Sequence, residues 1–157
     1  MANIEYRQGD VGLLGEIASL WEKLARYHSR LPTPFASTFR TITFAKRRKG
    51  LEQKAAGGQL QVILARDAAS ECDIAYSVSS LTSEGLGEIE SLYVEPDYRG
   101  RGIGDHLMRK SLAWLNERGV RSIRIGVGVG NEAALAFYRR YNFVPRTYIL
   151  GVPPDEG

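Results

Sequence analysis

A short run of glycines and arginines carries the clearest chemical signal in the sequence. Residues 95–104 read Glu-Pro-Asp-Tyr-Arg-Gly-Arg-Gly-Ile-Gly, and the final six are Arg99, Gly100, Arg101, Gly102, Ile103 and Gly104. Apolar residues at helical spacing follow, so this run lies where a helix begins. Backbone N–H groups that no side chain shields, together with the positive end of the helix dipole, can bind an anion. The sequence therefore predicts an anion-binding turn at residues 99–104.

The same run disfavours two common nucleotide sites. It lacks the Lys-Ser/Thr pair of a P-loop, and its glycine spacing differs from the G-x-G-x-x-G pattern of dinucleotide sites. ATP and NAD are therefore poor candidates for the bound anion.

The elements that must position this turn follow from hydrophobic spacing and turn residues. We expect a strand at 4–7, a helix capped by Asp10 and ending near His28, a proline loop at 31–34 and a second helix over 35–56. Strands are expected at 60–66, 73–81 and 87–94. A helix over 103–118, a strand at 122–127, a helix capped by Asn131 and a closing pair of short strands at 143–144 and 147–150 complete the order.

This order predicts the fold class. Three consecutive strands joined by short turns form an antiparallel meander, whereas the strand–helix–strand unit that follows requires parallel neighbours. We therefore expect an α/β (α+β) fold with a mixed, mostly antiparallel central sheet, one parallel strand–helix–strand unit and helices on both faces. Its 157 residues suit a single domain, 1–157.

Composition restricts the class of protein further. The longest stretch without a charged residue, 55–65, is too short to cross a bilayer, and the N-terminus has no apolar stretch typical of a secretory signal. We therefore expect a cytoplasmic protein with no membrane partner. One cysteine, Cys72, allows neither an internal disulfide nor a multi-cysteine metal site, and no metal is expected.

Charge is distributed unevenly along the chain. Between Glu22 and Glu52 there are eight Lys and Arg residues and no acid, although the net charge of the whole chain is only +3. Such a basic block either is a solvated helical face or attracts an anionic partner.

Several motifs together resemble one family. Arg99-x-x-Gly102-x-Gly104 follows a strand at 89–94, and Asn131 and Phe137-Tyr138-x-x-x-Asn142-Phe143 come about 30 residues later. This order and spacing resemble the GNAT acetyltransferases over residues 88–150. Asn142 stands where the family usually has glycine, and Asn is the next best residue for a left-handed turn.

The resemblance implies acetyl-CoA as co-substrate and assigns residues to it. The backbone of Leu92, Tyr93 and Val94 would pair with the pantetheine arm, and residues 99–104 would hold the pyrophosphate. Asn131 would help to position the pantetheine arm, and Tyr138 would stand near the thioester sulfur. In this family the two strands that flank the co-substrate diverge, which lets the thioester reach the acceptor.

Direct transfer of an acetyl group to an amine needs two proton-handling groups. An alkyl ammonium must lose a proton before it attacks, and a carboxylate is the expected acceptor. Glu90 matches the family position, while Glu88, two residues away on the same strand face, or a water chain are alternatives. Tyr138 could donate to the leaving thiolate, and its alternative is a core aromatic.

The sequence leaves more than one acceptor and more than one class of function open. A small-molecule primary amine is the first choice, followed by a protein N-terminus or lysine. A nucleic-acid-binding module and an acyl-CoA-binding protein without turnover are non-enzymatic alternatives, of which nucleic acid is disfavoured because the late aromatics fall at core-facing spacing. The sequence is also compatible with a homodimer.

Overall fold

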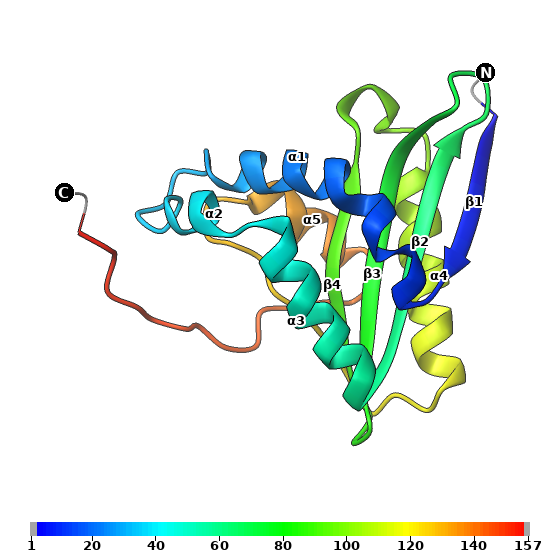
Figure 1. Cartoon of the computed structure of the whole chain (residues 1–157). Coiled ribbons are helices and arrows are strands. Elements are labelled where there is room, and N and C mark those ends of the chain that lie inside the picture. The colour runs from blue at the N-terminus through cyan, green and yellow to red at the C-terminus, as the bar shows by residue number, and fades with distance from the viewer. Residues whose placement is uncertain (1–2, 156–157) are drawn as a thin grey trace.

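In the computed structural model, which describes residues 3–155, five strands form one sheet in the order β1-β2-β3-β4-β5 (Figure 1). The strands are β1 (Ile4–Gly9), β2 (Gly58–Asp67), β3 (Cys72–Thr82), β4 (Leu86–Val94) and β5 (Ser122–Ile125). Neighbours from β1 to β4 are antiparallel, and β5 pairs with β4 in parallel. The expected mixed, mostly antiparallel sheet is confirmed, and residues 1–2 and 156–157 of the expected domain lie outside the described chain.

One face of the sheet is covered by the N-terminal helices (Figure 1). They are a 3-10 helix, η1 (Val11–Ile17), followed by α1 (Ala18–His28), α2 (Thr38–Thr41) and α3 (Phe44–Gly57). Asp10 caps the first of them, because its carboxylate accepts a bond of 3.0 Å from the Gly12 amide. The core between these helices and the sheet contains Leu14, Ile17, Leu20 and Leu51 against Leu60, Val62, Leu64 and Tyr76.

The expectation of one helix over 35–56 is wrong. Ile42 has an extended backbone, with φ −83° and ψ 120°, which separates α2 from α3. The hydroxyl of Thr43 then caps α3 by accepting a bond of 3.2 Å from the Lys46 amide. Threonine is unfavourable inside a helix but suits an N-cap, which explains why a new helix begins after Thr43.

The opposite face carries the helices that surround the glycine-rich turn. After β4 come a short 3-10 helix, η2 (Pro96–Tyr98), and α4 (Ile103–Glu117), and α5 (Glu132–Arg139) follows β5. Ile103, Leu107, Met108 and Leu115 of α4 are buried against the sheet. Helices on both faces are thereby confirmed, and no helix within residues 3–155 is long and apolar enough to span a membrane.

Two left-handed turns end these helices as the sequence predicts. Gly119 after α4 has φ 70°, and Asn142 after α5 has φ 68°. Asparagine tolerates this conformation better than most residues, so its presence in place of glycine does not disturb the turn.

The end of the chain departs from expectation. The predicted strands at 143–144 and 147–150 are not formed, and residues 143–155 have no regular secondary structure. Val144, Tyr148, Ile149 and Leu150 are exposed, and Pro145 has no amide hydrogen to donate to a ladder. The segment pairs with no strand within residues 3–155, although β5 has an unpaired edge.

Candidate active site

The parallel strands β4 and β5 part half-way along β4. Their pairing runs only from Leu86 opposite Ser122 to Ile89 opposite Ile125. β4 continues to Val94, so its second half has an edge that no strand of the described chain pairs with. Such a fork leaves backbone N–H and C=O groups free to bind an extended ligand.

A cleft of about 920 Å³ opens at this fork. One wall is formed by the second half of β4, the glycine-rich turn and α5, and the facing wall comes from α1, α2 and the start of α3. The cleft brings together nearly all the residues that the sequence singled out. These are Glu90, Leu92, Tyr93, Val94, Arg99, Gly100, Gly102, Ile103, Gly104, Asn131 and Tyr138.

The glycine-rich turn has the backbone geometry of an anion site. Gly100 and Gly102 have φ of 74° and 80°, in the left-handed region that disfavours other residues. A Cβ at either position would meet no protein atom within 4 Å, so the space beside both glycines is open. The first backbone bond of α4 runs from the His106 amide to the Gly102 carbonyl, 3.0 Å. The amides of residues 103–105 are therefore free at the positive end of the helix dipole.

The two arginines of the turn have different surroundings. Arg99 lines the cleft, and its Nε donates to the Val94 carbonyl at 2.9 Å, which ties the turn to the end of β4. Arg101 does not line the cleft, and its guanidinium lies 5.2 Å from the ring centre of Tyr98. Sequence alone gave both arginines the same role, whereas the structure brings only Arg99 to the cleft.

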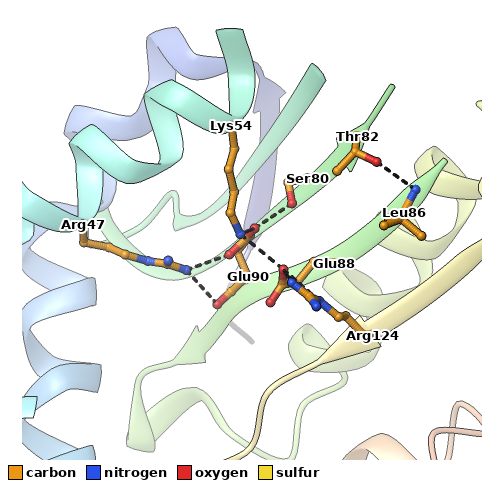
Figure 2. A network of polar contacts seen from close by, with 8 residues as sticks. All are labelled: Arg47, Lys54, Ser80, Thr82, Leu86, Glu88, Glu90 and Arg124. Atoms are coloured by element: carbon orange, nitrogen blue, oxygen red, sulfur yellow. Dashed lines mark hydrogen bonds and ion pairs between the residues drawn. The ribbon is translucent and has the colours of Figure 1, made fainter. Parts of the chain in front are cut away.

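Glu90 lies at the centre of a charged network (Figure 2). A β-bulge leaves it without a partner on β3, since Val78 faces Ser91 and Ser79 faces Ile89. Its carboxylate contacts the Lys54 ammonium, accepts a bond of 2.6 Å from the Ser80 hydroxyl and lies 2.9 Å from Nη2 of Arg47. Its side chain is only 2% exposed. The bulge thus turns a charged side chain inward, where cations from α3 meet it.

Glu88 extends the network toward β5 (Figure 2). Its carboxylate lies 3.2 Å from the Lys54 ammonium and 3.1 Å from the Arg124 guanidinium. Three cations therefore surround two carboxylates, and the local charge is net positive.

The network fixes the protonation state of Glu90. Burial by itself would raise its pKa, but hydrogen bonds from Lys54 and Ser80 and the charges of Lys54 and Arg47 together hold the pKa below its ordinary value. Glu90 is therefore a carboxylate at neutral pH.

Tyr138 reaches the cleft from α5. Its side chain is mostly buried, and its ring packs edge-on against Phe137 and Phe143. Burial raises the pKa of its hydroxyl to about 12, so the proton stays on the oxygen at neutral pH. A protonated phenol at the edge of a cleft is a hydrogen-bond donor.

Asn131 does not cap α5 as the sequence predicts. Its side chain makes no capping bond, and its Oδ1 instead accepts a bond of 3.2 Å from the Tyr27 hydroxyl. The long-range partner on α1 replaces the local one, so Asn131 joins the two walls of the cleft.

The facing wall is apolar and aromatic. It contains Trp21, Leu24, Tyr27, His28, Phe39 and Ile42, with Arg47 beside Glu90. Burial lowers the pKa of His28, so its imidazole is neutral at pH 7. Cys72 does not line the cleft.

A contact between Tyr141 and Asp105, which the sequence did not predict, also shapes the site. The Tyr141 hydroxyl donates to Asp105 at 2.5 Å, which joins the end of α5 to the first turn of α4. Burial, assisted by Asp105, raises the pKa of Tyr141 to about 12. An acidic residue in the first turn of a helix, as at Asp105, can be recognised in the sequence. Nothing in the sequence indicates that its partner is Tyr141, 36 residues later.

Comparison with known proteins gives the family. Residues 58–143 match the acetyltransferase (GNAT) family over more than half of the chain. The chain belongs to this family. The match includes β2 to α5 and thus the whole glycine-rich wall of the cleft, whereas α1–α3 lie outside it.

Two similar curated proteins are named as N-acetyltransferases. An uncharacterized N-acetyltransferase of Methanocaldococcus jannaschii is 36% identical over 80 residues, which cover 51% of this chain and 35% of that protein. N-alpha-acetyltransferase 30 of Schizosaccharomyces pombe is 40% identical over 57 residues, 36% of this chain and 38% of that protein. This GNAT chain therefore matches little more than a third of the length of these curated relatives.

Solved structures support the fold over nearly the whole chain. The aminoglycoside N-acetyltransferase AAC(6')-Iy in complex with CoA superposes with a TM-score of 0.69 at 15% identity, over 97% of this chain and 95% of that one. The N-terminal helices, which the sequence matched only in order, thus belong to the same GNAT fold.

Proposed function

We propose that this GNAT protein transfers the acetyl group of acetyl-CoA to a primary amine by direct attack within a ternary complex, and that the acceptor is a small molecule. The observation that carries this proposal is the shared cleft. It joins a free strand edge, an anion-binding turn, a buried carboxylate and a protonated phenol in one space. The family supplies acetyl transfer as the reaction these groups would serve.

The residues of the turn fit the co-substrate. The free amides of residues 103–105 and the open space at Gly100 and Gly102 suit a pyrophosphate. The free edge of Leu92 and Tyr93 suits the amides of a pantetheine arm, and Asn131 lines the same cleft. Arg99 supports the turn through Val94, and Arg101 contributes charge from outside the cleft.

In the reaction, the amine nitrogen forms a bond to the acetyl carbon and the carbon–sulfur bond breaks, so one proton leaves the nitrogen and the sulfur departs as a thiolate. We propose that Tyr138 donates a hydrogen bond or proton to that sulfur. Its raised pKa keeps the proton on the phenol oxygen, so the hydroxyl is available as a hydrogen-bond donor to the thiolate.

We propose that Glu90 receives the amine proton through water. Both of its oxygens already contact Arg47, Lys54 or Ser80, which disfavours direct contact with the acceptor. Its lowered pKa makes it a weak base, so a water chain or Glu88 is an alternative. His28 is a further alternative, since it is neutral and lines the facing wall.

The facing wall supports a particular class of small amine. Apolar and aromatic side chains surround one guanidinium, that of Arg47, in a region of net positive charge. This environment favours an amine that also carries an apolar group and a negative charge, and it disfavours polyamines. A protein N-terminus or lysine is the second candidate, and one relative is named as an N-alpha-acetyltransferase.

A panel of primary amines tests the proposal. Acetyl-CoA-dependent release of free thiol should appear with zwitterionic or anionic aromatic amines and stay at background with spermidine. Release with peptides alone would favour the protein acceptor. No release with any amine, combined with acetyl-CoA raising the melting temperature, would favour an acyl-CoA-binding protein without turnover. A rise with oligonucleotide alone would favour the nucleic-acid alternative.

A further inference from the structure

Arg47 is the one charged side chain that the described residues of α1–α3 contribute to the cleft. Its side chain is 29% exposed, and it bonds the protein through a single nitrogen atom. That atom, Nη2, donates to the Glu90 backbone carbonyl at 3.2 Å and to Oε2 of the Glu90 carboxylate at 2.9 Å. Within residues 3–155, Nε and Nη1 have no hydrogen-bond partner. The remaining donors of the guanidinium can therefore bind a carboxylate of a ligand.

The two oxygens of the Glu90 carboxylate have different partners (Figure 2). Oε1 contacts the Lys54 ammonium and accepts a bond of 2.6 Å from the Ser80 hydroxyl, and neither Lys54 nor Ser80 lines the cleft. Within residues 3–155, Oε2 is bound by Arg47 alone. Arg47 therefore covers the oxygen through which Glu90 could reach an acceptor, and it is the partner that a ligand in the cleft can contact.

An acceptor with a carboxylate beside its ammonium group can exchange partners with this ion pair. Its carboxylate would bind Arg47, and its ammonium would take the place of the guanidinium at Oε2 of Glu90. No buried charge is then left without a counter-charge, which keeps the cost of the exchange low. Because the guanidinium and Oε2 are 2.9 Å apart, the two groups of the acceptor must be close neighbours. An α-amino acid carries both groups on one carbon.

Given the proposed acetylation of a small amine, on which this inference rests, we propose that the acceptor is an apolar α-amino acid whose carboxylate draws Arg47 away from Glu90 and opens Oε2 to the ammonium. The side chain of the amino acid would lie against the facing wall, at Trp21, Leu24, Phe39 and Ile42. A peptide N-terminus has a neutral amide in place of the carboxylate, and spermidine has no anionic group. Neither supplies the charged partner that Arg47 needs.

The exchange also makes Glu90 a stronger base. Burial raises the pKa of Glu90, whereas hydrogen bonds from Lys54 and Ser80 lower it. The positive charges of Lys54 and Arg47 lower this pKa further, so the departure of Arg47 raises it. Glu90 then takes one proton from the ammonium, and the neutral amine keeps the lone pair that attacks the acetyl carbon. An amine without a carboxylate leaves Arg47 in place and Oε2 covered.

Acceptors that differ only in the carboxylate test the proposal. Thiol release from acetyl-CoA is measured with phenylalanine, tryptophan and leucine, with their amides, and with phenethylamine, tryptamine and isoamylamine. For at least one amino acid, kcat/KM should exceed the values of its amide and its amine by at least about thirtyfold, as expected when a buried charge pair loses one partner.

The same panel separates this inference from the proposed function. Equal or faster release with the amides or amines, or release only with other primary amines, overturns the amino-acid acceptor and leaves acetyl transfer to an amine standing. No release with any amine overturns the proposed function, and the amino-acid acceptor with it.

Arg47→Met and the matched control Lys54→Met test the exchange itself. Both remove a cation beside Glu90, but only Arg47 lines the cleft. Arg47→Met should lower kcat/KM for the amino acid at least about thirtyfold and raise kcat for the matched amine, because Oε2 is uncovered. Lys54→Met should change both acceptors by the same factor. An unchanged preference in Arg47→Met overturns the proposal. A lost preference with an unchanged kcat for the amine means that Arg47 binds the carboxylate without leaving Glu90, which overturns the exchange.

Arg47→Lys provides a second variant in case Arg47→Met does not fold. Lysine keeps the positive charge but lacks the planar fork of the guanidinium. The melting temperature should stay close to that of the wild type, and the preference for the amino acid over its amine should fall at least about threefold. A preference equal to that of the wild type would contradict recognition of the carboxylate by the guanidinium of Arg47.

Discussion

Replacing Gly102 by valine should weaken the binding of acetyl-CoA while the protein still folds. Gly102 is the N-cap of α4 and has φ 80°, and its Cβ position faces open space. In the free protein the substitution therefore meets no clash and costs only the left-handed conformation, about 1–2 kcal/mol. In a protein of this size, that lowers the melting temperature by roughly 2–8 °C.

The affinity for acetyl-CoA should also fall. The valine side chain would occupy the space beside the free amides of α4, and any relaxation of φ would turn those amides away from a bound phosphate. Loss of one hydrogen bond to a charged group costs about 1.5–3 kcal/mol, so we expect affinity to fall at least tenfold.

Gly119 provides a matched control. It has φ 70° and an equally open Cβ position, but it lies after the other end of α4 and does not line the cleft. Gly119→Val should therefore lose similar stability and keep the affinity for acetyl-CoA. Calorimetric titration of both variants is the measurement. Equal affinities of the two would refute the role given to the turn.

Three further predictions concern the buried polar groups of the cleft. Tyr138→Phe should lower kcat about 10–10³-fold with little change in melting temperature, because it removes only the hydroxyl. An unchanged kcat, with chemistry rate-limiting, would make Tyr138 a core aromatic. Glu90→Gln should lower kcat/KM at pH 7 by about 10²–10⁴-fold, with partial recovery at higher pH. If the variant keeps wild-type activity across about pH 6–9, another group such as Glu88 or His28 accepts the proton. Because the pKa of Glu90 is lowered in the folded protein, its contribution to stability is present above the ordinary carboxyl pKa and is lost as pH falls through the folded value. Acid unfolding of the wild type should therefore be steeper than that of Glu90→Gln.

The sequence by itself determined the order of most elements, from the first strand to α5, and the position of the glycine-rich turn. Left-handed turns at Gly119 and Asn142, the cap at Asp10 and the start of α4 at the glycine-rich run depend on a few neighbouring residues, so local chemistry predicts them. The parallel unit followed from a strand–helix–strand spacing, which leaves few topologies open.

Only the tertiary structure decided which polar groups meet. Glu90 acquires its lowered pKa from α3 and β3, whose side chains Arg47, Lys54 and Ser80 lie between 10 and 43 residues away in sequence. Asn131 was expected to cap its own helix, but Tyr27, 104 residues earlier, bonds it instead. At 147–150 strand propensity predicted a strand, but the segment pairs with no strand within residues 3–155. Side-chain partners and strand edges depend on how distant segments pack, and no local pattern encodes that.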